Sequence, residues 1–148
     1  MKARELWNLF SREKLPETIT YTAWAFGGAP DKLADLVVKG MKTATASAYD
    51  LYQLENEPLP KAGDYSVVLD SLGEAKCIIQ TTKVYVVPFF EVGETHAYKE
   101  GEGDRTLTYW RKVHKDFFTD CLKEVNLTFT EMTKVVCEEF HVVYLASA

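Results

Sequence analysis

Hydrophobic residues recur every three or four positions in several segments of the chain. This spacing gathers apolar side chains on one face of a helix, so it predicts amphipathic helices. We expect helices over residues 3–14, 30–39, 48–54 and 107–125. Pro16 follows the first segment and Gly40 follows the second, and both residue types are typical of helix ends. The segment over residues 107–125 has the longest apolar repeat and predicts the longest helix.

Between residues 61 and 88 the pattern changes to short runs rich in Val, Ile, Thr and Tyr, which are typical of strands. We expect strands over residues 65–69, 75–87 and 134–144, and the threonines of residues 42–47 also suit a strand. Residues 93–104 are polar and glycine-rich and predict a loop. The chain therefore predicts one α+β domain over residues 1–148, built as a small β-barrel or a strongly curled sheet with helices around it.

Composition and charge narrow the classes of protein. The 148 residues are 47% hydrophobic and 26% charged, which is the balance of a globular domain. The formal net charge of −5 disfavours attraction of the whole surface to nucleic acid or an anionic membrane, but it leaves room for a local basic cleft. Three cysteines without a C-x-x-C pair indicate free thiols, and no apolar run suits a signal peptide or a membrane span. We expect a cytoplasmic protein without membrane contact.

Lys42 and Thr45 are the first candidates for chemistry. A lysine offers a cation for a phosphate or a developing oxyanion, and a threonine hydroxyl offers a hydrogen bond or an activated nucleophile. Along a regular strand the two side chains point to opposite faces, so they converge only if the strand begins after Lys42 or bends. The alternative is a solvated lysine beside ordinary strand threonines.

Glu100 and Glu102 lie in the predicted loop before the long helix, where a carboxylate near a lysine is suited to acid–base work. The alternative is a solvated acidic loop that supplies negative charge to the start of that helix. His96 lies in the polar loop without an obvious partner, and His114 lies on the apolar stripe of the long helix, at the edge of the core. The three histidines lack metal-ligand spacing, and no phosphate-binding or dinucleotide-binding glycine motif is present. We therefore expect neither a metal nor a cofactor.

Aromatic and basic residues complete the candidates. Trp24, Phe26 and Trp110 are able to stack on bases, although large aromatic residues more often belong to the core. Arg105 and Arg111 add positive charge near the long helix, where a solvated face is the ordinary alternative.

An ordered series of short segments resembles the ASCH family. The segments are Trp24-Ala25-Phe26-Gly27, Gly40-Met41-Lys42-Thr43-Ala44-Thr45-Ala46-Ser47, Ala62-Gly63-Asp64, Val86-Val87-Pro88-Phe89-Phe90, Ala97-Tyr98-Lys99-Glu100-Gly101-Glu102-Gly103-Asp104 and Trp110-Arg111-Lys112-Val113-His114. The series spans residues 24–144, and residues 1–15 add an N-terminal helix. The resemblance implies a PUA-like β-barrel decorated by helices, with a cleft that binds RNA or a modified nucleoside or nucleotide.

The resemblance also implies site residues. One relative of this kind is an amidohydrolase that removes the acetyl group of N4-acetylcytidine, and its lysine and threonine fall on Lys42 and Thr45. Its glutamate falls on Glu100 or Glu102, depending on the landmark from which one counts. Beside these residues, we expect the ligand-binding positions of this chain to be Trp24, Phe26, Thr43, Ser47, Arg105 and Arg111.

Three hypotheses remain open from the sequence. The first is a cleft that binds RNA or a modified nucleotide. The second is an amidohydrolase that deacylates substrates like N4-acetylcytidine. The third is an interaction domain without catalytic activity.

Overall fold

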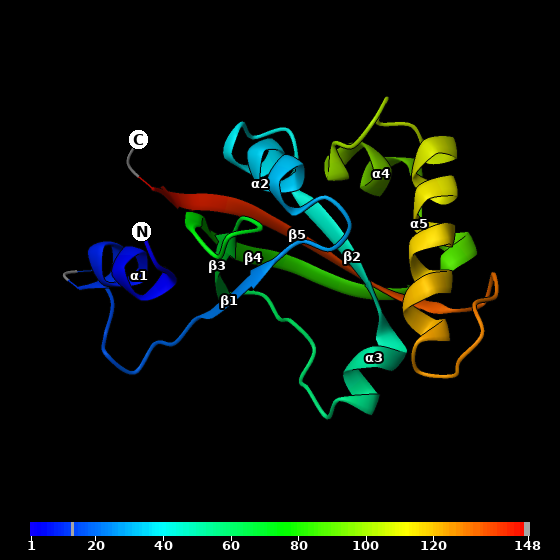
Figure 1. Cartoon of the computed structure of the whole chain (residues 1–148), viewed down its shortest axis with the longest axis horizontal. Coiled ribbons are helices and arrows are strands. Elements are labelled where there is room, and N and C mark those ends of the chain that lie inside the picture. Colours follow the sequence, from blue (N-terminus) through cyan, green and yellow to red (C-terminus); the bar gives the residue numbers. More distant parts are fainter. Residues whose placement is uncertain (13, 147–148) are drawn as a thin grey trace.

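Five strands pair into one mixed sheet in the computed structural model, which describes residues 1–12 and 14–146. The strands are β1 (Thr22–Ala25), β2 (Ala44–Ala48), β3 (Tyr65–Leu69), β4 (Ala75–Pro88) and β5 (Lys134–Leu145). Their order is β1-β3-β4-β5-β2, with β1 parallel to β3 and the other pairs antiparallel. Because β1 and β2 are the two edges of the sheet, the strands form half of a barrel that is open between them (Figure 1).

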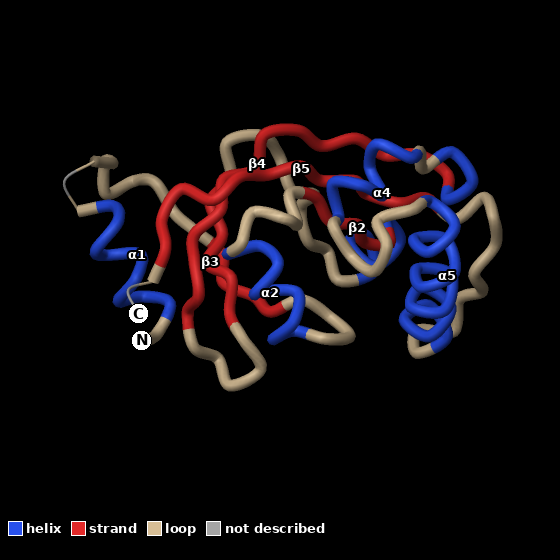
Figure 2. Tube along the Cα trace, turned by 90° about the horizontal axis from the view of Figure 1, so that it is seen from above, coloured by secondary structure: helices blue, strands red, loops and turns tan. Residues whose placement is uncertain are grey.

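The long strands β4 and β5 connect the two ends of the molecule. Their pairing changes register between Ile78 and Ile79 and again between Thr81 and Lys83. Such bulges increase the local twist and bend of a strand pair. Figure 2 shows the resulting curvature from above, with one end of the pair near the N-terminal helix and the other near the long helix.

Helices cover this curled sheet at three places. They are α1 (Ala3–Ser11), α2 (Pro30–Val38), α3 (Tyr49–Leu54), α4 (Glu94–Glu100) and α5 (Leu107–Lys123), with a 3-10 turn, η1 (Phe89–Glu91), after β4. Leu6, Trp7 and Phe10 of α1 pack on one end of the sheet, and Ala34 and Val37 of α2 pack on its middle. Four buried side chains of α5 face inward. Three of them, Trp110, Phe118 and Leu122, belong to the hydrophobic cluster at the other end of the sheet.

The α+β prediction of a barrel-like sheet decorated by helices is confirmed. The prediction of a loop over residues 93–104 is wrong for its first half, which forms α4. This helix is too short for its apolar and polar residues to show a helical repeat. It is stabilised by contacts of His96, Ala97 and Glu100 with other elements. Within the described ranges no helix is long and apolar enough to cross a membrane.

Candidate functional site

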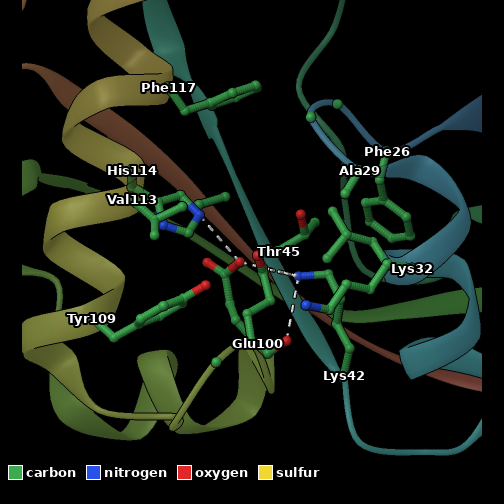
Figure 3. A pocket seen from close by; sticks show the side chains of 16 residues that line it. Phe26, Ala29, Lys32, Lys42, Thr45, Glu100, Tyr109, Val113, His114 and Phe117 are labelled. Atoms are coloured by element: carbon green, nitrogen blue, oxygen red, sulfur yellow. Dashed lines mark hydrogen bonds and ion pairs between the residues drawn. The ribbon is translucent and has the colours of Figure 1, made fainter.

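A cavity of about 250 Å³ opens between α2 and α5, with β2 and the end of α4 at its base. Figure 3 shows Phe26, Ala29 and Lys32 on one side and Tyr109, Val113, His114 and Phe117 of α5 on the other, with Lys42, Thr45 and Glu100 between them. The complete lining consists of Phe26, Gly27, Gly28, Ala29, Lys32, Leu33, Lys42, Thr45, Ala46, Glu100, Glu102, Gly103, Tyr109, Val113, His114 and Phe117.

Lys42 is held at the base of this cavity by the turn that follows α2. Its backbone N–H donates to the carbonyl of Leu36, and β2 begins only at Ala44. The strand therefore starts after Lys42, which is the condition under which Lys42 and Thr45 line the same space. The ammonium of Lys42 is 1% exposed and lies 3.1 Å from Glu100 Oε1 and 3.0 Å from Glu102 Oε2. A third contact, of 3.5 Å, runs to the backbone carbonyl of Glu100.

Glu100, the last residue of α4, is the centre of the buried polar cluster. Its Oε2 accepts hydrogen bonds of 2.6 Å from Trp110 Nε1 and from His96 Nε2, while its Oε1 faces Lys42 and, at 3.4 Å, His114 Nε2. Burial opposes ionisation of this carboxyl, but the charge of Lys42 and the hydrogen bonds from the two histidines outweigh burial and hold its pKa well below the ordinary value. Glu100 is thus a fixed carboxylate with donors on both oxygens.

Both ring nitrogens of His114 face acceptors. Its Nδ1 lies 2.9 Å from the carbonyl of Trp110, which only accepts, so Nδ1 donates. Its Nε2 lies 3.4 Å from Glu100 Oε1, which is an ion-pair distance when the ring is protonated. Burial lowers the pKa of His114, but the interaction with the Glu100 carboxylate outweighs burial and raises the pKa above its ordinary value. The His114 ring also stacks on the Trp110 ring, with centroids 4.2 Å apart.

Two glycines position Glu102 between the cluster and the cavity. Gly101 has a φ of 73°, and a Cβ there would lie 2.2 Å from the carbonyl oxygen of Met41. Gly103 has a φ of 58°, and a Cβ there would lie 2.4 to 2.6 Å from the ring of Tyr109. Both glycines therefore allow close packing within the protein, which lets the carboxylate of Glu102, 17% exposed, reach Lys42 from the cavity side.

Aromatic rings form the walls above this polar base. Phe26 follows β1 and lies with its ring 5.3 Å from Lys42 Nζ, while Tyr109 and Phe117 project from α5. Gly27 approaches Phe117 so closely that a Cβ would be 3.0 Å from its ring, so the loop after β1 touches α5 at one end of the cavity. Trp24 is not part of the lining, but its ring packs edge-on against Phe26 at 4.8 Å.

The structure places five of the six predicted ligand-binding residues outside the lining: Trp24 and four polar or basic residues. Thr43 donates a hydrogen bond to the carbonyl of Lys99, and Ser47 bonds the hydroxyl of Tyr52. Arg105 stacks on Tyr98 and donates to the carbonyls of Tyr98 and Met41. Arg111 donates to the carbonyl of Phe90. These four side chains bond the protein itself, so their predicted contact with a ligand would require them to leave these partners.

Sequence reasoning missed the roles of His96 and Trp110. His96 was placed in a polar loop without a partner, but it lies on α4, four residues before Glu100, and is 2% exposed. His114 lies at the edge of the core, 8% exposed, and also faces Glu100. The signal that was present is the spacing of four residues between His96 and Glu100 and between Trp110 and His114, which places each pair on one helical face.

Glu100, Glu102 and His114 also lie close enough to be tested as a metal site, since their ligand atoms are within 4.8 Å of one another. However, Lys42 Nζ occupies the space between the two carboxylates, and His114 Nε2 is a donor toward Glu100. A cation already neutralises this acidic pair, so we propose no metal site from these residues.

The fold and the cavity define a member of a known class. The family model of the ASCH domain matches residues 22–144. An ASCH domain from Lactobacillus crispatus JV V101 is 32% identical, with a TM-score of 0.86 over 95% of this chain and 91% of the other. A protein of Enterococcus faecalis V583 is 37% identical, with a TM-score of 0.85 over 96% of this chain and 88% of the other. No curated protein matches the chain.

The chain therefore belongs to the ASCH domain family. The half-barrel with its surrounding helices is the architecture it shares with these structures.

Proposed function

We propose that the cavity binds a single nucleobase, either of a modified nucleoside or nucleotide or at an unpaired position of RNA. The observation that carries this proposal is the pairing of aromatic walls with a buried polar base in one cavity. Aromatic side chains provide stacking surfaces for bases, and polar groups at the end of the stack are suited to read a base edge.

The dimensions of the cavity favour a small ligand. Its volume of about 250 Å³ is below the range of about 300 to 1,000 Å³ typical of pockets for drug-sized molecules. One base with part of its ribose is consistent with this space, whereas a base pair is not. RNA would therefore have to present an unstacked base, as single-stranded loops and ends do.

The charges of the cavity also argue for a base in its interior. All three hydrogens of the Lys42 ammonium have acceptors nearby, namely two carboxylates and one carbonyl. Lys42 is therefore poorly suited to the phosphate contact that the sequence suggested for it. The phosphate of any nucleotide is better placed at the mouth, near solvent.

Isothermal titration calorimetry with cytidine, uridine and short single-stranded RNA tests this proposal. Tyr109→Ala removes an aromatic wall and should weaken binding by roughly 1 to 3 kcal/mol, the usual contribution of one base–aromatic stack. Tyr98→Ala is the matched control, because Tyr98 is 57% exposed and lies outside the lining. The proposal fails if no base binds, which would favour an interaction domain, or if both variants lose affinity equally.

Hydrolysis of an acylated base is the second candidate function. The observation that favours it is the presence of the Thr45 hydroxyl in the same cavity as Lys42 and Glu102. Hydrolysis forms a bond between water oxygen and the acyl carbon and breaks the carbon–nitrogen bond, so the amine leaves with a proton. In this scheme Thr45 positions the water, and Lys42, 3.0 Å from Glu102 Oε2, fixes that carboxylate. Of the two glutamates, Glu102 is suited to the proton transfer, because both oxygens of Glu100 already have donors. The Glu102 carboxylate takes a proton from the water as the water oxygen bonds the acyl carbon, and it gives that proton to the amine nitrogen as the carbon–nitrogen bond breaks.

Incubation with N4-acetylcytidine, followed by chromatography for cytidine, tests hydrolysis. Thr45→Val keeps the shape of the side chain and removes the hydroxyl, so turnover should be lost. Thr43→Val is the control, since Thr43 lies in the same segment but outside the lining. An absence of turnover in the unaltered protein, or equal turnover in Thr45→Val, would exclude this reaction for this substrate.

A further inference from the structure

We infer that the cavity binds its ligand in one orientation, with the amino group of an amino-bearing base on Glu102 and the phosphate of the nucleotide at Lys32. The ligand class is then a nucleotide whose base carries an exocyclic amino group, such as that of cytosine, or such a nucleotide within RNA, and a base that offers only carbonyls at this position binds more weakly. The inference rests on the proposed function and specifies its ligand.

The inner end of the cavity presents an acceptor. Glu102 is a lining residue, and its Oε2 contacts Lys42 at 3.0 Å. Its second oxygen adds acceptor capacity on a side chain that is 17% exposed, whereas both oxygens of the more deeply buried Glu100 already have donors. A carboxylate oxygen accepts hydrogen bonds and never donates, so it favours an exocyclic amino group and disfavours a carbonyl.

The outer end of the cavity presents a cation. Lys32 lies on α2, is exposed, and lines the same cavity as Glu102. Figure 3 shows it on the wall formed by Phe26 and Ala29, opposite α5. Lys42, the other lysine of the lining, is 1% exposed and engaged by carboxylates. A phosphate therefore meets free positive charge only by lying toward Lys32.

The two ends together determine the orientation. Exposure increases from Lys42 and Glu100 through Glu102 to Lys32, so the polar groups form a gradient from carboxylates inside to a lysine outside. A ligand in the reverse orientation would place its phosphate beside two carboxylates, which repel it. The orientation with the base inward satisfies both ends.

Calorimetric titration with CMP, UMP and cytidine tests the inference. CMP carries an amino group at the ring position where UMP carries a carbonyl, and cytidine lacks the phosphate of CMP. CMP should bind about tenfold more tightly than UMP, as expected for one hydrogen bond to a charged acceptor. CMP should also bind several-fold more tightly than cytidine, and added salt should remove that second difference.

Two variants separate the ends, each with a matched control. Glu102→Gln offers both a donor and an acceptor, so the preference for CMP over UMP should fall to nearly nothing; Glu94→Gln, an exposed change on α4, should preserve it. Lys32→Ala should remove the advantage of CMP over cytidine; Lys39→Ala, on the same helix and paired with Asp35, should preserve it.

The outcomes distinguish this inference from the proposed function. If neither CMP nor UMP nor cytidine binds, the proposed function itself fails. If CMP and UMP bind equally well, or if Lys32→Ala leaves the phosphate preference intact, the cavity binds bases but the orientation is wrong.

Discussion

Replacing Gly101 by alanine should destabilise the protein far more than the same change at Gly73. Both glycines have positive φ, 73° and 79°, so alanine at either position costs about 1 to 2 kcal/mol for the left-handed backbone. At Gly73 a Cβ would meet nothing within 4 Å. At Gly101 it would lie 2.2 Å from the carbonyl oxygen of Met41 and 2.7 Å from its carbon, so one of the two backbone segments must move by about 1 Å.

That movement separates the groups on which the site depends. Lys42 follows Met41 directly, and Glu100 and Glu102 flank Gly101, so the displacement acts on ion pairs of 3.0 and 3.1 Å. Breaking a buried ion pair costs about 3 to 5 kcal/mol, because it leaves an uncompensated charge. The total for Gly101→Ala is then about 4 to 7 kcal/mol, a large share of the usual stability of about 5 to 15 kcal/mol.

Equilibrium unfolding in urea, followed by tryptophan fluorescence, measures this difference. With a typical slope of about 2 kcal/mol per molar urea, Gly73→Ala should lower the midpoint by roughly 0.5 to 1 M and Gly101→Ala by roughly 2 M or more. Equal midpoints for the two variants would refute the reasoning, because only the close approach to Met41 distinguishes the two positions.

Three further predictions concern the buried cluster. Because folding lowers the pKa of Glu100, this carboxylate contributes fully to stability above the ordinary pKa of 4.5, and the contribution is lost as the pH falls below that value. The urea midpoint should therefore drop in acid, and Glu100→Gln should make the midpoint less dependent on pH. Because folding raises the pKa of His114, its contribution to stability is complete below pH 6.5 and is lost as the pH rises through the higher pKa of the folded state. An NMR titration of the imidazole should show this raised pKa directly, and a midpoint below pH 6.5 would contradict it. Trp110→Phe removes the indole donor to Glu100, and the lost hydrogen bond should lower the free energy of unfolding in urea by about 1.5 to 3 kcal/mol. Trp7→Phe is the control, because it makes the same change of ring at a residue that stacks on Tyr21, and its effect should be smaller.

Periodicity was sufficient to predict most helices and strands of the fold. The long helix over 107–125 corresponds to α5 (Leu107–Lys123), and the expected strands over 75–87 and 134–144 correspond to β4 and β5. These elements bury a continuous face, so their sequences carry the repeat that such a face requires. The short helix α4 was missed because it spans only seven residues, and its buried face combines His96, Ala97 and Glu100 rather than apolar residues alone.

The sequence was sufficient to select four candidate residues that lie together, but not to predict the contacts between them. Lys42, Thr45, Glu100 and Glu102 were chosen from the sequence, and the structure brings all four to one cavity. The hydrogen bonds that distinguish Glu100 from Glu102 depend on how α4 packs against α5, which no local pattern contains.

The basic residues show the opposite error. Arg105 and Arg111 were selected for charge alone, but each donates to nearby carbonyls outside the cavity. Lys32, which does line the cavity, was not selected, because an exposed lysine on an amphipathic helix is the ordinary pattern of a solvated face. Its position becomes informative only when the loop after β1 and α5 are in place around it.

An NMR titration of isotope-labelled protein with CMP tests the central claim most directly, because it reports both binding and its location. We expect saturable shifts of backbone signals at the cavity, in Phe26, Thr45, Glu102 and Tyr109, with α1 unaffected. Shifts that are absent at high ligand concentration, or that map to another surface, would contradict the assignment of this cavity as a nucleobase site.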